Sequence, residues 1–167
     1  MAGLINIGIA KIELGDLAAD GGVATSFAAL GYTEEGSAQL TWDDPQETEF
    51  SVEELDTPLY VSTKDGKKKI AFKISNPDED TLVKLMGGTK TGTGANTVYK
   101  YPSTTVDLEQ TVKITPTKGM GLVLTRCKIT AKLSSNLGRA ALMAVEVMGT
   151  VLQPTKTSEA PLSTFRV

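Results

Sequence analysis

Seven carboxylates crowd the stretch between Asp43 and Asp56, and no basic residue lies among them. Acidic side chains this close could hold a cation or supply the carboxylate pair of a glycosidase. A calcium loop counted from Asp43 fails, because Pro45 takes a ligand position and Thr48 takes the place of the required glycine. An irregular site made only of carboxylates and a solvated acidic surface are the alternatives.

The glycine-rich segment 87–97, GGTKTGTGANT, could be a phosphate-binding loop. The P-loop pattern requires Gly-Lys-Ser/Thr between a strand and a helix, whereas here Thr89 precedes Lys90 and a predicted helix comes first. The dinucleotide fingerprint fails as well, because Gly94 is followed by Ala95-Asn96-Thr97. The segment is therefore predicted to join the helix to the next strand.

The composition excludes much enzymology, because the chain contains no histidine. Ser-His-Asp and Cys-His catalysis and histidine-ligated metal sites are thereby removed. The single cysteine, Cys127, lies in an alternating strand pattern and is predicted to be a buried apolar residue. We expect no enzyme activity, no catalytic or metal-binding residue and no cofactor.

The charge pattern argues against nucleic-acid recognition and against a membrane protein. The net charge is −3, and the 17 basic residues are scattered apart from one lysine cluster. The N-terminus lacks the basic region of a signal peptide, and the longest late apolar run, residues 140–145, is too short to span a bilayer. A soluble protein made in a reducing cytoplasm is expected.

Period-two alternation dominates the chain and is clearest where Leu108, Val112 and Ile114 interleave with polar residues. The pattern favours about seven antiparallel strands, arranged as a β-sandwich or barrel with one short flanking helix. The predicted strands span residues 4–13, 37–43, 58–63, 67–75, 96–101, 106–115, 121–133 and 139–152.

The one predicted helix lies near residues 77–86. Asn76 is its expected cap, Pro77 takes the first helical position, and Gly87 ends it. Around it we expect a single domain over residues 1–167, with long loops at about 14–36 and 44–57 and an irregular tail at about 154–167. Trp42 alternates with Leu40 and is predicted to face the core.

Strand alternation within the acidic stretch would place Glu47, Glu49 and Glu53 on one face and Phe50 on the other. Like charges on one face repel one another, and a basic partner would relieve that repulsion. The lysine cluster, Lys64 with residues 67–69, could supply the partner, either within one chain as a hairpin or between two copies.

The order of these features resembles that of the tail tube proteins of long-tailed bacteriophages, a family related in fold to the tube protein of type VI secretion. The resemblance covers roughly residues 4–152. The features that carry it are the strand at 5–9 (INIGI), the turn at 30–36 (LGYTEEG) before the Leu40 strand, the acidic loop, the strand at 72–74 (FKI) before the helix, and the strand end at 112–116 (VKITP).

The resemblance implies a β-sandwich flanked by a helix, six copies to a ring, and rings stacked into a hollow tube through which DNA passes as cargo. It implies subunit contacts through about residues 2–10 and 44–69. The candidate contact residues are Leu4, Ile5, Ile7, Glu47, Glu49, Phe50, Glu53, Glu54, Lys64, Lys67, Lys68 and Lys69.

The same resemblance implies the partners and the location of the protein. The partners would be further copies of the chain, the tape measure protein, the tail terminator and the baseplate or tip proteins. The protein would lie in the virion tail after synthesis in the host bacterial cytoplasm. The alternatives are a ligand- or carbohydrate-binding β-sandwich, another tail component such as a terminator, and a relative of the secretion tube.

Overall fold

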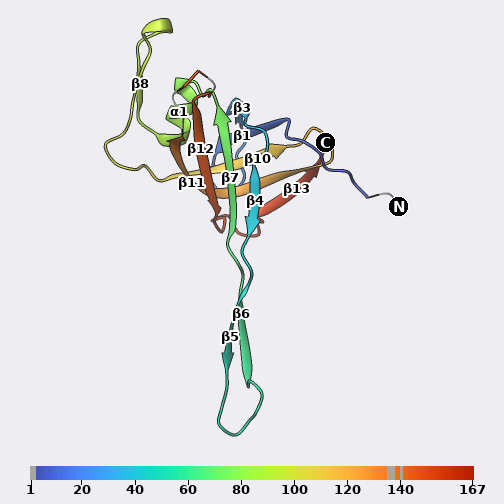
Figure 1. The fold of residues 1–167 in the computed structure, drawn as a ribbon. Helices are drawn as coiled ribbons and strands as arrows, with labels where there is room; N and C mark the ends of the chain where they lie inside the picture. The colour runs from blue at the N-terminus through green and yellow to red at the C-terminus, as the bar shows by residue number, and fades with distance from the viewer. Residues whose placement is uncertain (1–2, 135–137, 140) are drawn as a thin grey trace.

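A computed structural model describes residues 3–134, 138–139 and 141–167 of the chain (Figure 1). Most of the ordered structure is β-strand, with one α-helix, α1 (Glu79–Met86), and one short 3-10 helix, η1 (Gly94–Asn96). The strands are β1 (Lys11–Asp16), β2 (Ala28–Ala29), β3 (Tyr32–Thr33), β4 (Gln39–Trp42), β5 (Gln46–Phe50), β6 (Tyr60–Lys64), β7 (Lys68–Ser75), β8 (Thr89–Thr91), β9 (Val98–Lys100), β10 (Leu108–Thr115), β11 (Met120–Ser134), β12 (Ala144–Val151) and β13 (Leu162–Arg166).

The main sheet has nine strands in the order β2-β1-β10-β11-β12-β7-β3, with β13 paired to β11 and β4 paired to β7. Its ladders are antiparallel. Three strands lie between β1 and β7 in that order, yet Ile12 of β1 and Phe72 of β7 belong to one buried cluster. The sheet therefore curves around its own core.

The two ends of this sheet are linked in the chain only by Leu30 and Gly31, which lie between β2 and β3. Leu30 is 1% exposed, and its N–H donates to the Ile12 carbonyl at 3.1 Å. Gly31 has a φ of +102°, which residues with a Cβ rarely adopt. No ladder in the described residues joins β2 to β3, so the sheet is wrapped without closing into a barrel.

The buried cluster draws on strands across the whole sheet and on α1. Apolar residues alternate along β7, where Ile70, Phe72 and Ile74 are each at most 2% exposed. Cys127 is fully buried in the same cluster, as predicted. The remaining fully or nearly buried members are Ile12, Leu14, Leu30, Leu82, Leu85, Val112, Leu124, Ile129, Val145 and Val147.

Helix α1 lies against β11 and covers one side of the core through Leu82 and Leu85 (Figure 1). The prediction of a mainly β fold with antiparallel strands and one short helix is confirmed. The helix ends at Gly87 as expected, and the Gly87 N–H donates to the Val83 carbonyl at 2.9 Å.

The start of α1 differs from the prediction, because Asp78 caps the helix instead of Asn76. The Asp78 carboxylate accepts a hydrogen bond from the Thr81 N–H at 2.8 Å. Asn76 has a φ of +51°, and its N–H donates to the Met143 carbonyl at 2.7 Å. Asn76 therefore belongs to the turn that leaves β7, and the helix begins two residues after Pro77.

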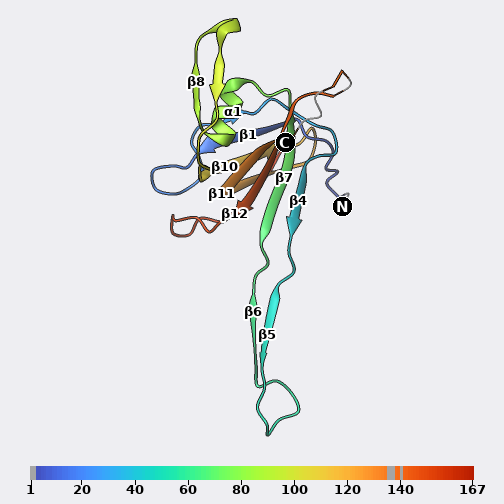
Figure 2. The same ribbon diagram turned by 60° about the vertical axis from the view of Figure 1, so that its left-hand side comes forward.

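Two hairpins protrude from the wrapped sheet toward opposite ends of the molecule (Figures 1 and 2). Strands β5 and β6 form the longer one, which continues from β4 and β7 away from the sheet. We call residues 46–64 the arm. Strands β8 and β9 form the other, so the glycine-rich segment predicted as a simple connection lies within a second hairpin.

Each predicted strand after residue 36 overlaps an observed strand. These pairs are 37–43 with β4, 58–63 with β6, 67–75 with β7, 96–101 with β9, 106–115 with β10, 121–133 with β11 and 139–152 with β12; residue 140 lies outside the described residues.

The predicted first strand at 4–13 is wrong in its start, because β1 begins at Lys11 and runs to Asp16. Residues 5–9 alternate, but in the described chain their only β-pairing is an isolated bridge between Ile7 and Lys118. This segment has no neighbouring strand in the described chain with which it could form a ladder, despite its alternating sequence.

Three segments predicted to be irregular contain strands. The loop expected at 14–36 holds the end of β1 together with β2 and β3, the loop at 44–57 holds β5, and the tail at 154–167 holds β13. These strands are short or largely polar, so their sequences lack the alternating apolar signal that burial produces. Their strand structure comes from ladder pairing, with β11 in the case of β13.

Trp42 does not face the core, contrary to the prediction. The prediction that Trp42 and Leu40 share one side of β4 fits the ladder, in which Leu40 lies opposite the buried Ile70. Trp42, however, lies opposite Lys68 at the far end of the strand. Trp42 is 56% exposed, and the Lys68 ammonium lies 4.3 Å from its ring centroid. Strand β4 therefore extends past the end of the core.

Candidate interaction surfaces

The arm is exposed along its full length. Each residue of β5 and of β6 is exposed to solvent, as is each residue of the connecting segment 51–59. A two-stranded hairpin without a covering layer is marginally stable in water. An arm with this composition is typical of a segment that gains its contacts from another molecule.

The ladder gives the arm two chemically different faces. Directly opposed residues point to the same side, and the pairs alternate along the hairpin. Glu47 and Glu49 share one face with Val61, whereas Phe50 lies opposite Tyr60 on the other, with ring centroids 6.1 Å apart. The predicted separation of Glu47 and Glu49 from Phe50 matches this register, whereas Glu53, predicted on the same face as Glu47, lies beyond the end of β5.

The arm also displays more apolar surface than the sequence analysis identified. Besides Phe50, five apolar or aromatic side chains of the arm are between 37% and 64% exposed: Val52, Leu55, Leu59, Tyr60 and Val61. Leu59, Tyr60 and Val61 lie in the alternating pattern at 58–63, but that pattern does not say whether the apolar face meets its own chain.

The lysine cluster lies at the base of the arm, and the side chains of Lys68 and Lys69 are engaged there. Lys69 forms an ion pair with Asp43 at 2.9 Å, and Lys68 stacks on Trp42. Lys64 lies opposite Gln46, and the Lys67 carbonyl accepts from the Asp43 N–H at 2.9 Å.

The acids of the arm do not meet these lysines within the chain. In the described residues no ion pair within 4.0 Å involves Glu47, Glu49, Glu53 or Glu54. Within the described chain the acids of the arm therefore form no ion pair with the lysine cluster, although Asp43, just outside the arm, pairs with Lys69.

The N-terminal segment 3–10 is a second exposed apolar surface. Leu4, Ile5 and Ile7 are 46%, 65% and 62% exposed. Several hydrogen bonds anchor the segment to the turn between β10 and β11. Among them, the Ile7 N–H donates to the Lys118 carbonyl at 3.1 Å, and the Asn6 side chain accepts from the Met120 N–H at 2.7 Å. Residue 2, within the predicted contact region, lies outside the described residues.

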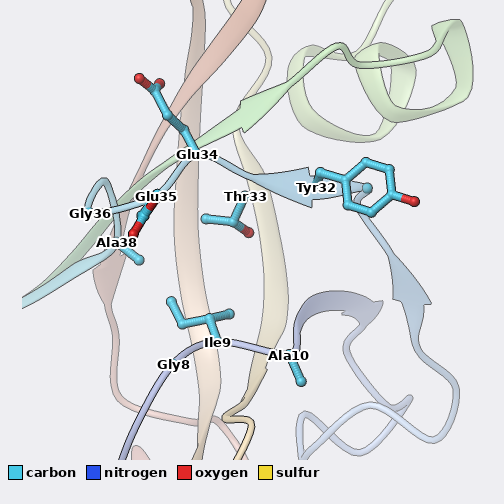
Figure 3. A pocket seen from close by; sticks show the side chains of 10 residues that line it. Gly8, Ile9, Ala10, Tyr32, Thr33, Glu34, Glu35, Gly36 and Ala38 are labelled. Carbon is cyan, nitrogen blue, oxygen red and sulfur yellow. The ribbon is translucent and has the colours of Figure 1, made fainter.

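An open pocket of about 470 Å³ lies between the N-terminal segment at Gly8 to Ala10 and the turn that follows β3 (Figure 3). Ile9 and Thr33 face one another across it, while the Tyr32 and Glu34 side chains point away. Small-molecule sites combine apolar walls with a few convergent polar groups. This arrangement does not supply such a convergent set.

The remaining candidates for chemistry are isolated from one another. Among the described residues no group of three or more Asp, Glu or Cys side chains is placed to hold a metal ion. Burial raises the pKa of the Cys127 thiol to about 12, so the thiolate required for nucleophilic attack is suppressed. No helix in the described part of the chain is long and apolar enough to cross a membrane.

Comparison with known proteins identifies the chain at the level of the family. A family model described as phage tail tube protein matches residues 14–165, a span that contains most of the wrapped sheet, α1 and the arm. Comparison with curated proteins gives no significant match. Since the family model covers most of the sequence, the chain belongs to the phage tail tube protein family and is a structural component of the phage tail.

Proposed function

We propose that this protein polymerises into stacked hexameric rings and that the stack is the hollow tail tube through which phage DNA passes. The observation that carries the proposal is the arm, an uncovered hairpin with one aromatic and one acidic face. Within a chain of the tail tube family, such a hairpin is suited to bind a neighbouring subunit.

The contacts of the assembly are proposed to come from the arm, the base of the arm and the N-terminal segment. A ring or a stack uses heterologous interfaces, in which a patch on one copy meets a different patch on the next. The proposed contact residues are Leu4, Ile5, Ile7, Glu47, Glu49, Phe50, Glu53, Glu54, Lys64, Lys67, Lys68 and Lys69. The tape measure, terminator and baseplate or tip proteins are proposed as further partners.

Removal of the arm tests this function directly. Deletion of residues 45–64 leaves Asp44, Asp65 and Gly66 as a short turn between β4 and β7, and Asp-Gly is a favourable turn sequence. The core is untouched, because no residue of the arm belongs to the buried cluster. We expect the intact protein to form rings or tubes in negative-stain electron microscopy and the deletion variant to remain monomeric in sedimentation.

The control is thermal unfolding of the two proteins at a concentration where neither assembles. Similar melting temperatures would show that the deletion removes assembly without unfolding the subunit. Tubes formed by the deletion variant would contradict the role of the arm. An intact protein that stays monomeric at every salt and protein concentration would contradict the proposed function as a whole.

A further inference from the structure

The arm carries a strong unbalanced charge for which its own chain supplies no partner. Residues 46–64 contain five carboxylates and one lysine, a net charge of −4. Its acids form no ion pair within the described chain, and Lys68 and Lys69 at its base already contact Trp42 and Asp43. A matching surface must be basic and must also offer exposed apolar groups.

A surface with both properties lies beside the N-terminal segment of the described chain. It lies where the N-terminal segment meets the turn before β11 and the end of β13. There the Val167 N–H donates to the Gly119 carbonyl at 3.0 Å, and Arg166 pairs with Met120 in the ladder. We call this surface the N-terminal cluster: Ile5, Ile7, Lys118, Met120, Arg166 and Val167.

The cluster is exposed, apolar and positively charged at its side chains. Ile5, Ile7, Met120 and Val167 are between 40% and 65% exposed, and Lys118 and Arg166 are exposed as well. Residues 3–10 contain no charged side chain, and no carboxylate of the described chain lies within 4.0 Å of the Lys118 or Arg166 side chain.

We infer that the N-terminal cluster of one subunit is the docking surface for the arm of a neighbouring subunit, with Lys118 and Arg166 facing the acids of the arm. The inference rests on the proposed function, since it requires that copies of the chain assemble. Apolar side chains of the arm, such as Leu55 and Phe50, then cover Ile5 and Ile7, while opposite charges fix the orientation of the two segments.

A rival surface on the β8–β9 hairpin fits less well. It displays Val98 and Tyr101, which are 52% and 56% exposed, together with Lys100. The lysine on β8, Lys90, is already paired with Asp80 at 2.6 Å, and Glu79 lies close enough to raise its pKa further. The acids at the start of α1 therefore offset the positive charge of this hairpin, and an acidic arm gains less there.

The geometry at Gly119 shows that the N-terminal segment packs closely against the turn before β11. Gly119 has a φ of +112°, and a Cβ at this position would lie 2.1 Å from the Asn6 side chain and 2.7 Å from the Ile5 carbonyl. The close approach of the N-terminal segment to this turn therefore requires glycine. The segment is held in a defined place, as a docking surface must be.

Charge reversal is the first test. The double variant Lys118→Glu, Arg166→Glu should raise the protein concentration needed for assembly roughly tenfold at low salt, because like charges would then face one another. The matched control is Lys84→Glu, Lys100→Glu, which makes the same change of net charge on exposed residues elsewhere. Adding Glu53→Lys, Glu54→Lys to the first variant should restore assembly.

Site-specific cross-linking is the second test, and it identifies the contact itself. A Leu55→Cys chain is mixed with an affinity-tagged Ile5→Cys chain under mild oxidation, so that the mixed dimer can be recognised by its size. Cys127 gives no background, because it is fully buried and its thiol pKa is about 12. The control pairs Leu55→Cys with a tagged Val98→Cys chain.

A mixed dimer between the arm and Ile5→Cys, absent with Val98→Cys, together with the charge rescue, is the expected result. Tubes that form without this cross-link and tolerate the reversal of Lys118 and Arg166 would overturn the inference and leave the proposed tube intact. The cross-link without rings or tubes would support the docking contact and contradict the tube. The absence of both would overturn both proposals.

Discussion

Two kinds of side chain alternate along both β7 and β5, but the surroundings of the two strands differ completely. In β7, alternate residues from Ile70 to Ile74 are buried in the core, with β12 on one edge and β3 and β4 on the other. In β5 each residue is exposed, and β6 is its only neighbour in the described residues. Alternation therefore indicates a face suited to burial without saying whether the same chain buries it.

The largest difference should appear when one phenylalanine is removed from each region. Phe72→Ala should lower the free energy of unfolding by about 3–5 kcal/mol, because it leaves a cavity in the core. Phe50→Ala should change it by less than about 0.5 kcal/mol, since Phe50 is 53% exposed in the isolated subunit. Urea unfolding of unassembled protein measures both values. Equal losses would break the distinction between sheet and arm.

An intermediate effect on stability is expected at the N-terminal cap of α1. This helix covers the core, whereas the arm has no covering element in the described chain. Asp78→Ala should lower the free energy of unfolding by about 1 kcal/mol, because the Thr81 N–H loses its acceptor. Hydrogen bonds from Thr81 hold the pKa of the Asp78 carboxyl below its ordinary value of 3.8. The stabilisation from the ionised carboxylate is therefore present above that value and is lost as the pH falls through the folded pKa.

Unfolding at pH 7 and at about pH 3 measures this dependence, and the difference between wild type and Asp78→Ala should shrink at the lower pH. Asp78→Asn is the matched control, because asparagine caps helices about as well as aspartate and does not titrate. A difference between wild type and Asp78→Asn that stays constant across this pH range would contradict the assignment.

The smallest effect is expected at the base of the arm, where the two regions meet. The Lys69 and Asp43 side chains are 48% and 40% exposed, so their coupling energy in a double-mutant cycle should be only about 0.2–1 kcal/mol. Salt at about 1 M should remove most of it, because the screening length falls to about 3 Å. A coupling above this range that persists in salt would mean that the arm is held more rigidly than its exposure indicates.

Sequence alone predicted most of the core, although Leu14 and Leu30 are buried within the segment predicted as a loop at 14–36. The strands that contain Phe72, Val112 and Cys127 and the helix with Leu82 and Leu85 follow from apolar periodicity, which records burial directly. Strands such as β13, whose pairing partner β11 is distant in the sequence, leave little local trace. Their position depends on the assembled sheet.

The surfaces were harder to predict than the core for a related reason. Trp42 was predicted to be buried from a correct alternation, because the sequence does not show where the core ends along β4. The sequence singles out the acids and the lysines near the arm, but it does not give the fold that keeps the acids of the arm away from those lysines. The cluster of Lys118 and Arg166 with Ile7 joins three distant segments and becomes visible only in three dimensions.

The pairing of β1 with the distant strand β10 also bears on the order in which the parts of the subunit can fold during synthesis. Strand β1 pairs with β10, so Lys11 finds its partner Thr115 about a hundred residues later in the chain. While the ribosome synthesises the intervening residues, β1 has only the two-residue strand β2 to pair with, and the arm already displays its apolar side chains. Nascent chains that stop before β10 should therefore be sensitive to protease and dependent on chaperones, and the sheet should form only near the end of translation.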